Sequence, residues 1–143
     1  MKSYTDIEQS RKLAEILPIE SADMYYQYVL PKSDKIKHNP EIGNPIESLE
    51  WYNKGYTLSG KEPLTLEEYC IPCWSLAALL NVLPKNIKSP FGEVNPFVGQ
   101  VDIKDYRCVY LDGDWDSNIQ TFASNPVDAC YEMILELHEQ NLI

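Results

Sequence analysis

The chain has 143 residues and a formal net charge of −10, with 44% hydrophobic and 11% aromatic residues. It is long enough to bury a core and too apolar for a disordered segment, so we expect one domain spanning residues 1–143. The negative charge repels phosphates and argues against direct nucleic-acid binding. A partner of the acidic surface is expected to be a basic protein, and the oligomeric state is left open.

The sequence also bears on the compartment. No stretch approaches the run of about 20 apolar residues that crosses a bilayer, and the first residues, MKSYTDIEQSRKLAEIL, do not resemble a signal peptide. We therefore expect a cytoplasmic protein that does not associate with membranes. Its four cysteines, Cys70, Cys73, Cys108 and Cys130, are then expected to be reduced thiols.

The first predicted helix begins at a capping box formed by Thr5 and Glu8 and ends before Pro18. Residues 24–30 are rich enough in aromatic and β-branched side chains to form a strand. Ser21 could instead cap a short helix there, and this alternative stays open.

Residues 31–44 contain prolines, glycine and asparagines, which predict a long surface loop. Asn44 offers an N-cap and is followed by a proline at the first helical position, so a helix is predicted over residues 45–54. Gly55 would end this helix, and residues 56–59 are predicted as a short strand.

Thr65 and Glu68 form a second capping box ahead of a nearly continuous apolar run. Pro72 suits the first turn of a helix and Pro84 lies just beyond its end, so the run predicts a helix over residues 73–83. A helix that is apolar on all sides is normally buried on all sides, which makes this one the expected centre of the core.

Residues 84–105 are rich in proline and glycine and are predicted as a second long loop. Residues 106–111 and 119–123 then predict a hairpin with a long acidic turn. The last helix begins at Asn125-Pro126 and is closed by Asn141. Its apolar face holds Val127, Cys130, Tyr131, Ile134 and Leu137. The expected fold class is α+β, with a small, mostly antiparallel sheet packed against a buried central helix and two amphipathic terminal helices.

Three segments share a recognisable pattern: Pro72–Pro84 with Trp74-Ser75-Leu76 and Leu79-Leu80, Asn125-Pro126-Val127-Asp128-Ala129, and Ser21-Ala22-Asp23-Met24-Tyr25-Tyr26. The pattern resembles a family of short proteins from anaerobic gut bacteria and their prophages. The resemblance implies a compact single-domain protein carried by a mobile element. It implies no known activity and transfers no catalytic residue.

The motif Cys70-Ile71-Pro72-Cys73 suggests thiol chemistry, because a cysteine at a helix N-terminus has a lowered pKa. Thioredoxin-like enzymes place such a motif after a buried strand, whereas the residues before Cys70 are acidic and more typical of a helix. The pattern favours packing cysteines. A thiol–disulfide oxidoreductase, with Cys70 as nucleophile and Cys73 as resolving thiol, is the alternative function.

The acidic turn has oxygen-bearing side chains at alternate positions, as in a calcium loop. These residues are Asp112, Asp114, Asp116 and Asn118. Ser117 stands where the loop needs glycine and Ala123 where it needs glutamate, so a solvated hairpin turn is favoured. The spacing of Cys108 and Cys130 does not suggest zinc, and no cofactor is expected.

The aromatic residues are more numerous than one small core requires. They include Tyr25, Tyr26, Tyr28, Trp51, Tyr52, Tyr56, Tyr106, Tyr110 and Trp115. Most are expected at the edge of the core, and some are available for an exposed patch of the kind found at interfaces. We therefore expect a non-enzymatic interaction or accessory protein, associated with a phage or another mobile element, rather than an enzyme.

Overall fold

The computed structural model describes the chain except for residues 86, 90–91, 95, 101–104 and 111–118. The described residues divide into two compact units. The N-terminal unit comprises Asp6–Ala78, and the C-terminal unit comprises Met1–Thr5 with Leu79–Ile143. Both contain helices and small antiparallel sheets, which confirms the α+β class. The expectation of a single domain stays a prediction.

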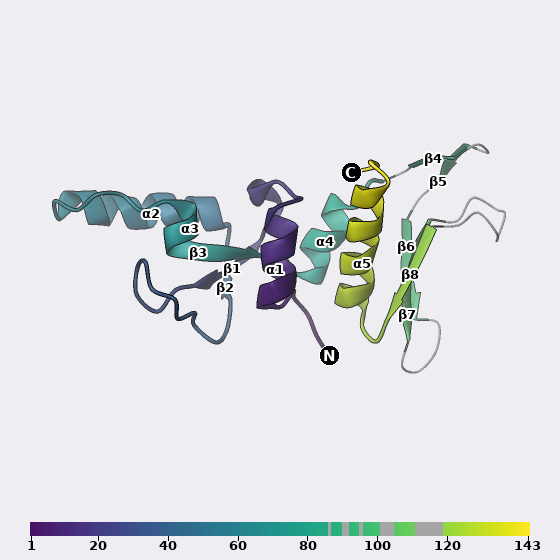
Figure 1. The fold of residues 1–143 in the computed structure, drawn as a ribbon, viewed down its shortest axis with the longest axis horizontal. Helices are drawn as coiled ribbons and strands as arrows, with labels where there is room; N and C mark the ends of the chain where they lie inside the picture. Colours follow the sequence, from purple (N-terminus) through teal and green to yellow (C-terminus); the bar gives the residue numbers. More distant parts are fainter. Residues whose placement is uncertain (86, 90–91, 95, 101–104, 111–118) are drawn as a thin grey trace. The chain divides into compact units, whose positions relative to one another are not determined.

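The N-terminal unit is built on a three-stranded antiparallel sheet in the order β2-β1-β3 (Figure 1). Its strands are β1 (Met24–Gln27), β2 (Glu41–Ile42) and β3 (Cys70–Cys73). Its helices are α1 (Ile7–Ala14), the short 3-10 helix η1 (Ile19–Ser21), α2 (Pro45–Leu58) and α3 (Leu66–Tyr69). The strand expected over residues 24–30 is therefore present as β1, and α1 packs against β3.

The predicted cap of α1 is wrong by one residue. Asp6, not Thr5, is the N-cap, and its carboxylate accepts a hydrogen bond from the Gln9 backbone N–H at 2.9 Å. The Gln9 side chain accepts one from the Asp6 N–H at 3.1 Å, which completes the capping box. A shift of one residue preserves the box because both pairs of side chains carry the oxygens it requires.

Helix α2 is longer than predicted. Asn44 caps it as expected, but the helix continues through Gly55 to Leu58, so the expected strand over residues 56–59 is wrong. Tyr56 stacks on Tyr52 one turn earlier, with ring centroids 5.4 Å apart. Such a contact between residues four apart stabilises helical geometry.

The central helix predicted over residues 73–83 is present only in its later part, as α4 (Leu76–Val82), because Cys70–Cys73 form β3. A short apolar run fits a buried strand as well as a buried helix, and here residues 70–73 pair with β1. Ser75 begins α4 instead, since its Oγ accepts a hydrogen bond from the Ala78 N–H at 3.2 Å. Leu80 is 44% exposed, so α4 is not buried on all sides.

The C-terminal unit contains a β4–β5 hairpin and a second three-stranded antiparallel sheet in the order β6-β7-β8 (Figure 1). Its strands are β4 (Ile87–Ser89), β5 (Gly92–Val94), β6 (Pro96–Gln100), β7 (Tyr106–Tyr110) and β8 (Ile119–Ala123). The hairpin predicted from residues 106–123 is confirmed in its two strands. The loop predicted over residues 84–105 is wrong, because Pro96 is tolerated at the first residue of β6.

Helix α5 (Pro126–Glu139) packs against β7 and β8 with its predicted apolar face inward. Val127, Cys130, Ile134 and Leu137 are fully buried, whereas Tyr131 is half-buried. Asn141 has a positive φ of 58°, and the amides of Asn141 and Leu142 donate to the carbonyls of His138 and Leu137. This pattern is a Schellman motif, and it closes the helix as predicted.

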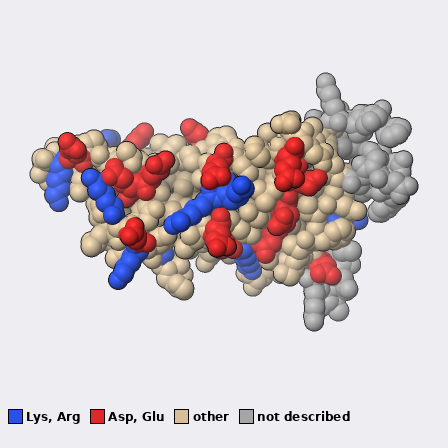
Figure 2. Space-filling view, in the orientation of Figure 1, with Lys and Arg blue, Asp and Glu red and all other residues tan. Residues whose placement is uncertain are grey.

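Acidic side chains follow the solvent side of α5, as the row of red atoms over this helix in Figure 2 shows. Asp128 in its first turn forms an ion pair with Lys2 at 2.7 Å, within the C-terminal unit. Within the described residues, no helix is both long and apolar enough to cross a membrane.

Candidate functional site: an aromatic and acidic surface on α2

Cys70 and Cys73 lie in β3 rather than at a helix N-terminus. Neighbouring side chains of a strand alternate between its faces, so residues 70 and 73 point in opposite directions. Their Cα atoms are about 10 Å apart along a strand, farther than a disulfide can bridge. Both thiols are buried, and burial raises the pKa of Cys70 to about 12. A hollow of about 460 Å³ adjoins Cys70, but its thiol stays protonated at neutral pH.

The other two cysteines meet in the C-terminal unit. Cys108 on β7 and Cys130 on α5 are fully buried, and their thiols share a hydrogen bond that raises the pKa of Cys108. All four cysteines are free. Among the described residues, no group of three or more His, Cys, Asp or Glu side chains could hold a metal ion. The calcium-loop candidates Asp112, Asp114, Asp116 and Asn118 lie outside the described residues.

Two of the segments that carry the family resemblance contact each other in the N-terminal unit. The Trp74 indole N–H donates to Ser21 Oγ at 2.9 Å. The backbone N–H and hydroxyl of Ser75 both donate to the Asp23 carboxylate, at 2.9 and 2.5 Å. These bonds join the start of α4 to the chain before β1.

The aromatic residues gather where α2 passes the sheet of the N-terminal unit. Tyr69 lies at the centre, with ring centroids 5.9 Å from Tyr25 and 5.2 Å from Tyr52. Strand β1 positions Tyr25, α2 positions Tyr52, and the capping box of Thr65 and Glu68 fixes the short helix that ends at Tyr69. Burial, followed by the neighbouring Tyr25, raises the pKa of Tyr69, so its hydroxyl stays neutral.

Asn53 holds the segment after α2 in place. Its side-chain amide donates to the Leu64 carbonyl at 3.0 Å and accepts from the Leu64 N–H at 2.9 Å. Leu64 is buried in a cluster with Tyr69, and Tyr52 and Tyr56 pack against this cluster. The Asn53 side chain therefore holds the segment around Leu64 against the aromatic cluster.

A first hollow opens between α2 and the sheet, and we call it the acidic pocket. Its volume is about 490 Å³. It is lined by Tyr25, Gln27, Glu41, Glu47, Ser48, Trp51, Tyr52 and Tyr69. Glu41 and Glu47 are exposed, and neither pairs with a Lys or Arg among the described residues. The pocket thus combines aromatic walls with two carboxylates available to a ligand.

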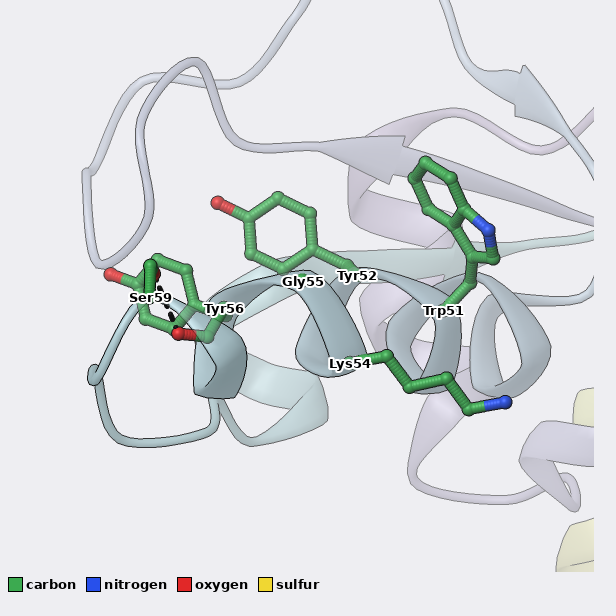
Figure 3. A pocket seen from close by; sticks show the side chains of 6 residues that line it. All are labelled: Trp51, Tyr52, Lys54, Gly55, Tyr56 and Ser59. Atoms are coloured by element: carbon green, nitrogen blue, oxygen red, sulfur yellow. Dashed lines mark hydrogen bonds between the residues drawn. The ribbon is translucent and has the colours of Figure 1, made fainter.

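A second hollow, which we call the α2 groove, runs along the helix itself (Figure 3). Its volume is about 440 Å³. It is lined by Trp51, Tyr52, Lys54, Gly55, Tyr56 and Ser59. Figure 3 shows Trp51 and Tyr52 rising from the same side of α2, with Gly55 beyond them along the helix. Trp51 is 78% exposed and borders both hollows.

The sequence pointed to this surface only through its surplus of aromatic residues. Tyr25, Trp51, Tyr52 and Tyr56 were among those expected to be available for a patch. Tyr69, Glu41 and Glu47 were missed. Glu41 joins the site through the pairing of β2 with β1, and Tyr69 directly precedes β3, which also pairs with β1. Glu47 lies on α2, one turn before Trp51, so helical spacing could have found it. The position of Trp51 beside charged residues in a predicted helix was the one local signal of an exposed indole.

No protein-family model matches this chain, and neither a curated protein nor a solved structure is significantly similar to it. The resemblance to the gut-bacterial and prophage family therefore stays a prediction from the sequence.

Proposed function

We propose that this chain is a non-enzymatic interaction protein whose acidic pocket receives a Lys or Arg side chain from a basic protein partner. The observation that carries the proposal is a pair of exposed carboxylates, Glu41 and Glu47, which form no ion pair with any described Lys or Arg and lie beside a wall of aromatic rings. The rings can pack on the apolar stem of a long cationic side chain and attract its charge.

The carboxylates complement the other end of such a side chain. A guanidinium or ammonium group between them forms charge-assisted hydrogen bonds, which are stronger than neutral ones. The net charge of −10 adds a longer-range attraction for a basic partner and speeds its approach. Both effects weaken with added salt, which gives the binding a recognisable ionic-strength dependence.

A cytoplasmic location and a role in a mobile element form part of this proposal. The four free thiols support a reducing compartment, and the resemblance of the three segments supports the mobile element. The alternative oxidoreductase is not favoured, because β3 directs Cys70 and Cys73 to opposite faces.

The test uses two short peptides that differ in one chemical group: a glycine–arginine repeat, and the same repeat with citrulline, which is neutral, in place of arginine. We expect the arginine peptide to bind at low salt and to change the fluorescence of Trp51, and the citrulline peptide to bind at least about tenfold more weakly. The double variant Glu41→Gln/Glu47→Gln should bind the arginine and citrulline peptides with similar affinity.

The matched control is Glu8→Gln/Glu20→Gln, which removes the same charge from exposed positions outside the pocket. It should keep the preference for arginine, with only the modest loss expected from the lower net charge. Equal losses in the two double variants, or equal binding of both peptides by the unaltered chain, would contradict the proposed site.

A further inference from the structure

Helix α2 has a solvent-facing side that is unusually apolar. Trp51 is 78% exposed and Leu58 is 89% exposed, two turns apart along the same side of the helix. Large exposed apolar side chains scattered singly need no explanation, but here Trp51 lines a groove, and Leu58 follows two turns later on the same side of the helix. The α2 groove, Trp51 and Leu58 all lie within the N-terminal unit.

Gly55 forms the floor of the α2 groove, and the backbone does not require a glycine there. Its φ is not in the left-handed region, and a Cβ built at this position meets nothing within 4 Å. Glycine lowers helix stability relative to alanine at such a position. Because Gly55 has no side chain, it leaves a notch between Trp51 and Tyr56, and a larger side chain at this position would fill the notch.

The charges of this segment are divided between its two halves. Residues 45–50 carry Glu47 and Glu50 and no basic residue, whereas residues 51–61 carry Lys54 and Lys61 and no acidic residue. Lys61 lies over the Tyr56 ring, 5.1 Å from its centroid, at the end of the groove. The charges of this segment are therefore complementary to those of a second, antiparallel copy of the same segment.

We propose that α2 pairs antiparallel with α2 of a second copy of this chain, so that Trp51 of each copy fills the notch over Gly55 of the other. A two-fold axis gives each contact twice, since residue 51 meets residue 55 and residue 55 meets residue 51. The acidic residues 45–50 of each segment then face the basic part of the partner's segment, which includes Lys61 just beyond α2, and the exposed side chains of Trp51 and Leu58 leave water.

This pairing goes beyond the proposed binding of a basic partner. Trp51 and Glu47 line the acidic pocket, so self-association and a basic ligand compete for them. Gly55 lines only the α2 groove and Glu41 only the acidic pocket, so variants at these two positions test the two proposals separately.

The first experiment measures the dimer dissociation constant by sedimentation velocity for the full chain, Gly55→Leu and the matched control Thr57→Leu. Thr57 is exposed on the same helix, but it does not line the groove. We expect a native dissociation constant in the range of about 1–100 µM, at least about a tenfold weakening in Gly55→Leu, and little change in Thr57→Leu. Circular dichroism checks that all three chains remain folded.

A charge exchange tests the antiparallel arrangement. Glu47→Lys/Glu50→Lys makes the segment wholly basic, and Lys54→Glu/Lys61→Glu makes it wholly acidic, so each variant should be monomeric alone. Their equimolar mixture should form a heterodimer. The proposal is overturned if the native chain is monomeric at about 1 mM, if Gly55→Leu dimerises as tightly as Thr57→Leu, or if the mixture stays monomeric. A monomer that binds another protein through α2 would assign the groove to that protein.

Discussion

Cys70 illustrates how neighbouring residues decide the chemistry of a side chain. In the motif Cys70-Ile71-Pro72-Cys73 its thiol resembles a nucleophile, yet it is 2% exposed and its pKa rises to about 12 through desolvation. The thiolate, not the thiol, reacts with electrophiles and disulfides. The environment of β3 therefore converts a reactive group into a small packing side chain.

We expect Cys70 to be strongly protected from alkylation in the folded chain. At pH 8, iodoacetamide should label it at least about a hundredfold more slowly than in denaturant, with the modified residue identified by mass spectrometry. Labelling at the rate of an exposed thiol would contradict the burial and would restore the oxidoreductase alternative.

The same group contributes to stability in a pH-dependent way. The pKa of Cys70 is about 12 in the folded chain and about 9 for a free thiol. Its contribution is fully present below pH 9 and is lost as the pH rises towards 12. Thiolate absorbance at 240 nm, compared between the chain and Cys70→Ala, reports the folded titration. A Cys70 signal that appears near pH 9 without unfolding would contradict this assignment.

At the scale of elements, α2 carries both proposed binding features and is also the helix with the least favourable residue in its interior. Gly55 sits between Lys54 and Tyr56, away from either cap. Removing this glycine should strengthen the helix while closing the groove, so stability and association are expected to change in opposite directions.

Gly55→Ala should raise the free energy of unfolding by about 0.5–1 kcal/mol, because alanine loses less backbone entropy in a helix. Urea unfolding followed by circular dichroism, at a concentration where the chain is monomeric, measures the change. Gly60 has a φ of +81°, so Gly60→Ala is the contrasting variant and should be destabilising. A loss of stability in Gly55→Ala would show that Gly55 has a structural role.

The helices and strands also show which sequence signals were sufficient to predict the local structure. The capping box at Thr65 and the cap at Asn125 act within one turn, and the structure confirms both. The helix predicted over residues 73–83 begins only at Leu76, because residues 70–73 pair with β1, more than forty residues earlier. The acidic pocket could not be predicted from the sequence because it also depends on strand pairing: Glu41 reaches the pocket through the pairing of β2 with β1.

At the scale of the whole molecule, the large negative net charge is the main property that the packing of the core does not account for. The net charge of −10 is accompanied by few ion pairs among the described residues, and the Lys2–Asp128 pair, at 2.7 Å, lies within the C-terminal unit. A folded chain with excess charge of one sign repels itself, and this repulsion opposes the compact state.

Moderate salt is therefore expected to stabilise the chain. Raising sodium chloride from about 0.01 to 0.15 M shortens the screening length from about 30 to 8 Å, which should raise the melting temperature by a few degrees. Differential scanning calorimetry measures the effect, and the basic peptide should bind more weakly over the same range. A melting temperature that falls with salt would indicate that attractive ion pairs dominate instead.

The two hydrogen bonds between the Asn53 side chain and the Leu64 backbone have a consequence for how the fold opens. Leu64 lies outside every helix and strand, yet its amide is bonded to a side chain that α2 carries. Its hydrogen can exchange with solvent only when that bond breaks. The exchange rate of the Leu64 amide therefore reports local unfolding. It measures how often the segment that contains Leu64 separates from α2 and exposes the aromatic cluster that packs on it.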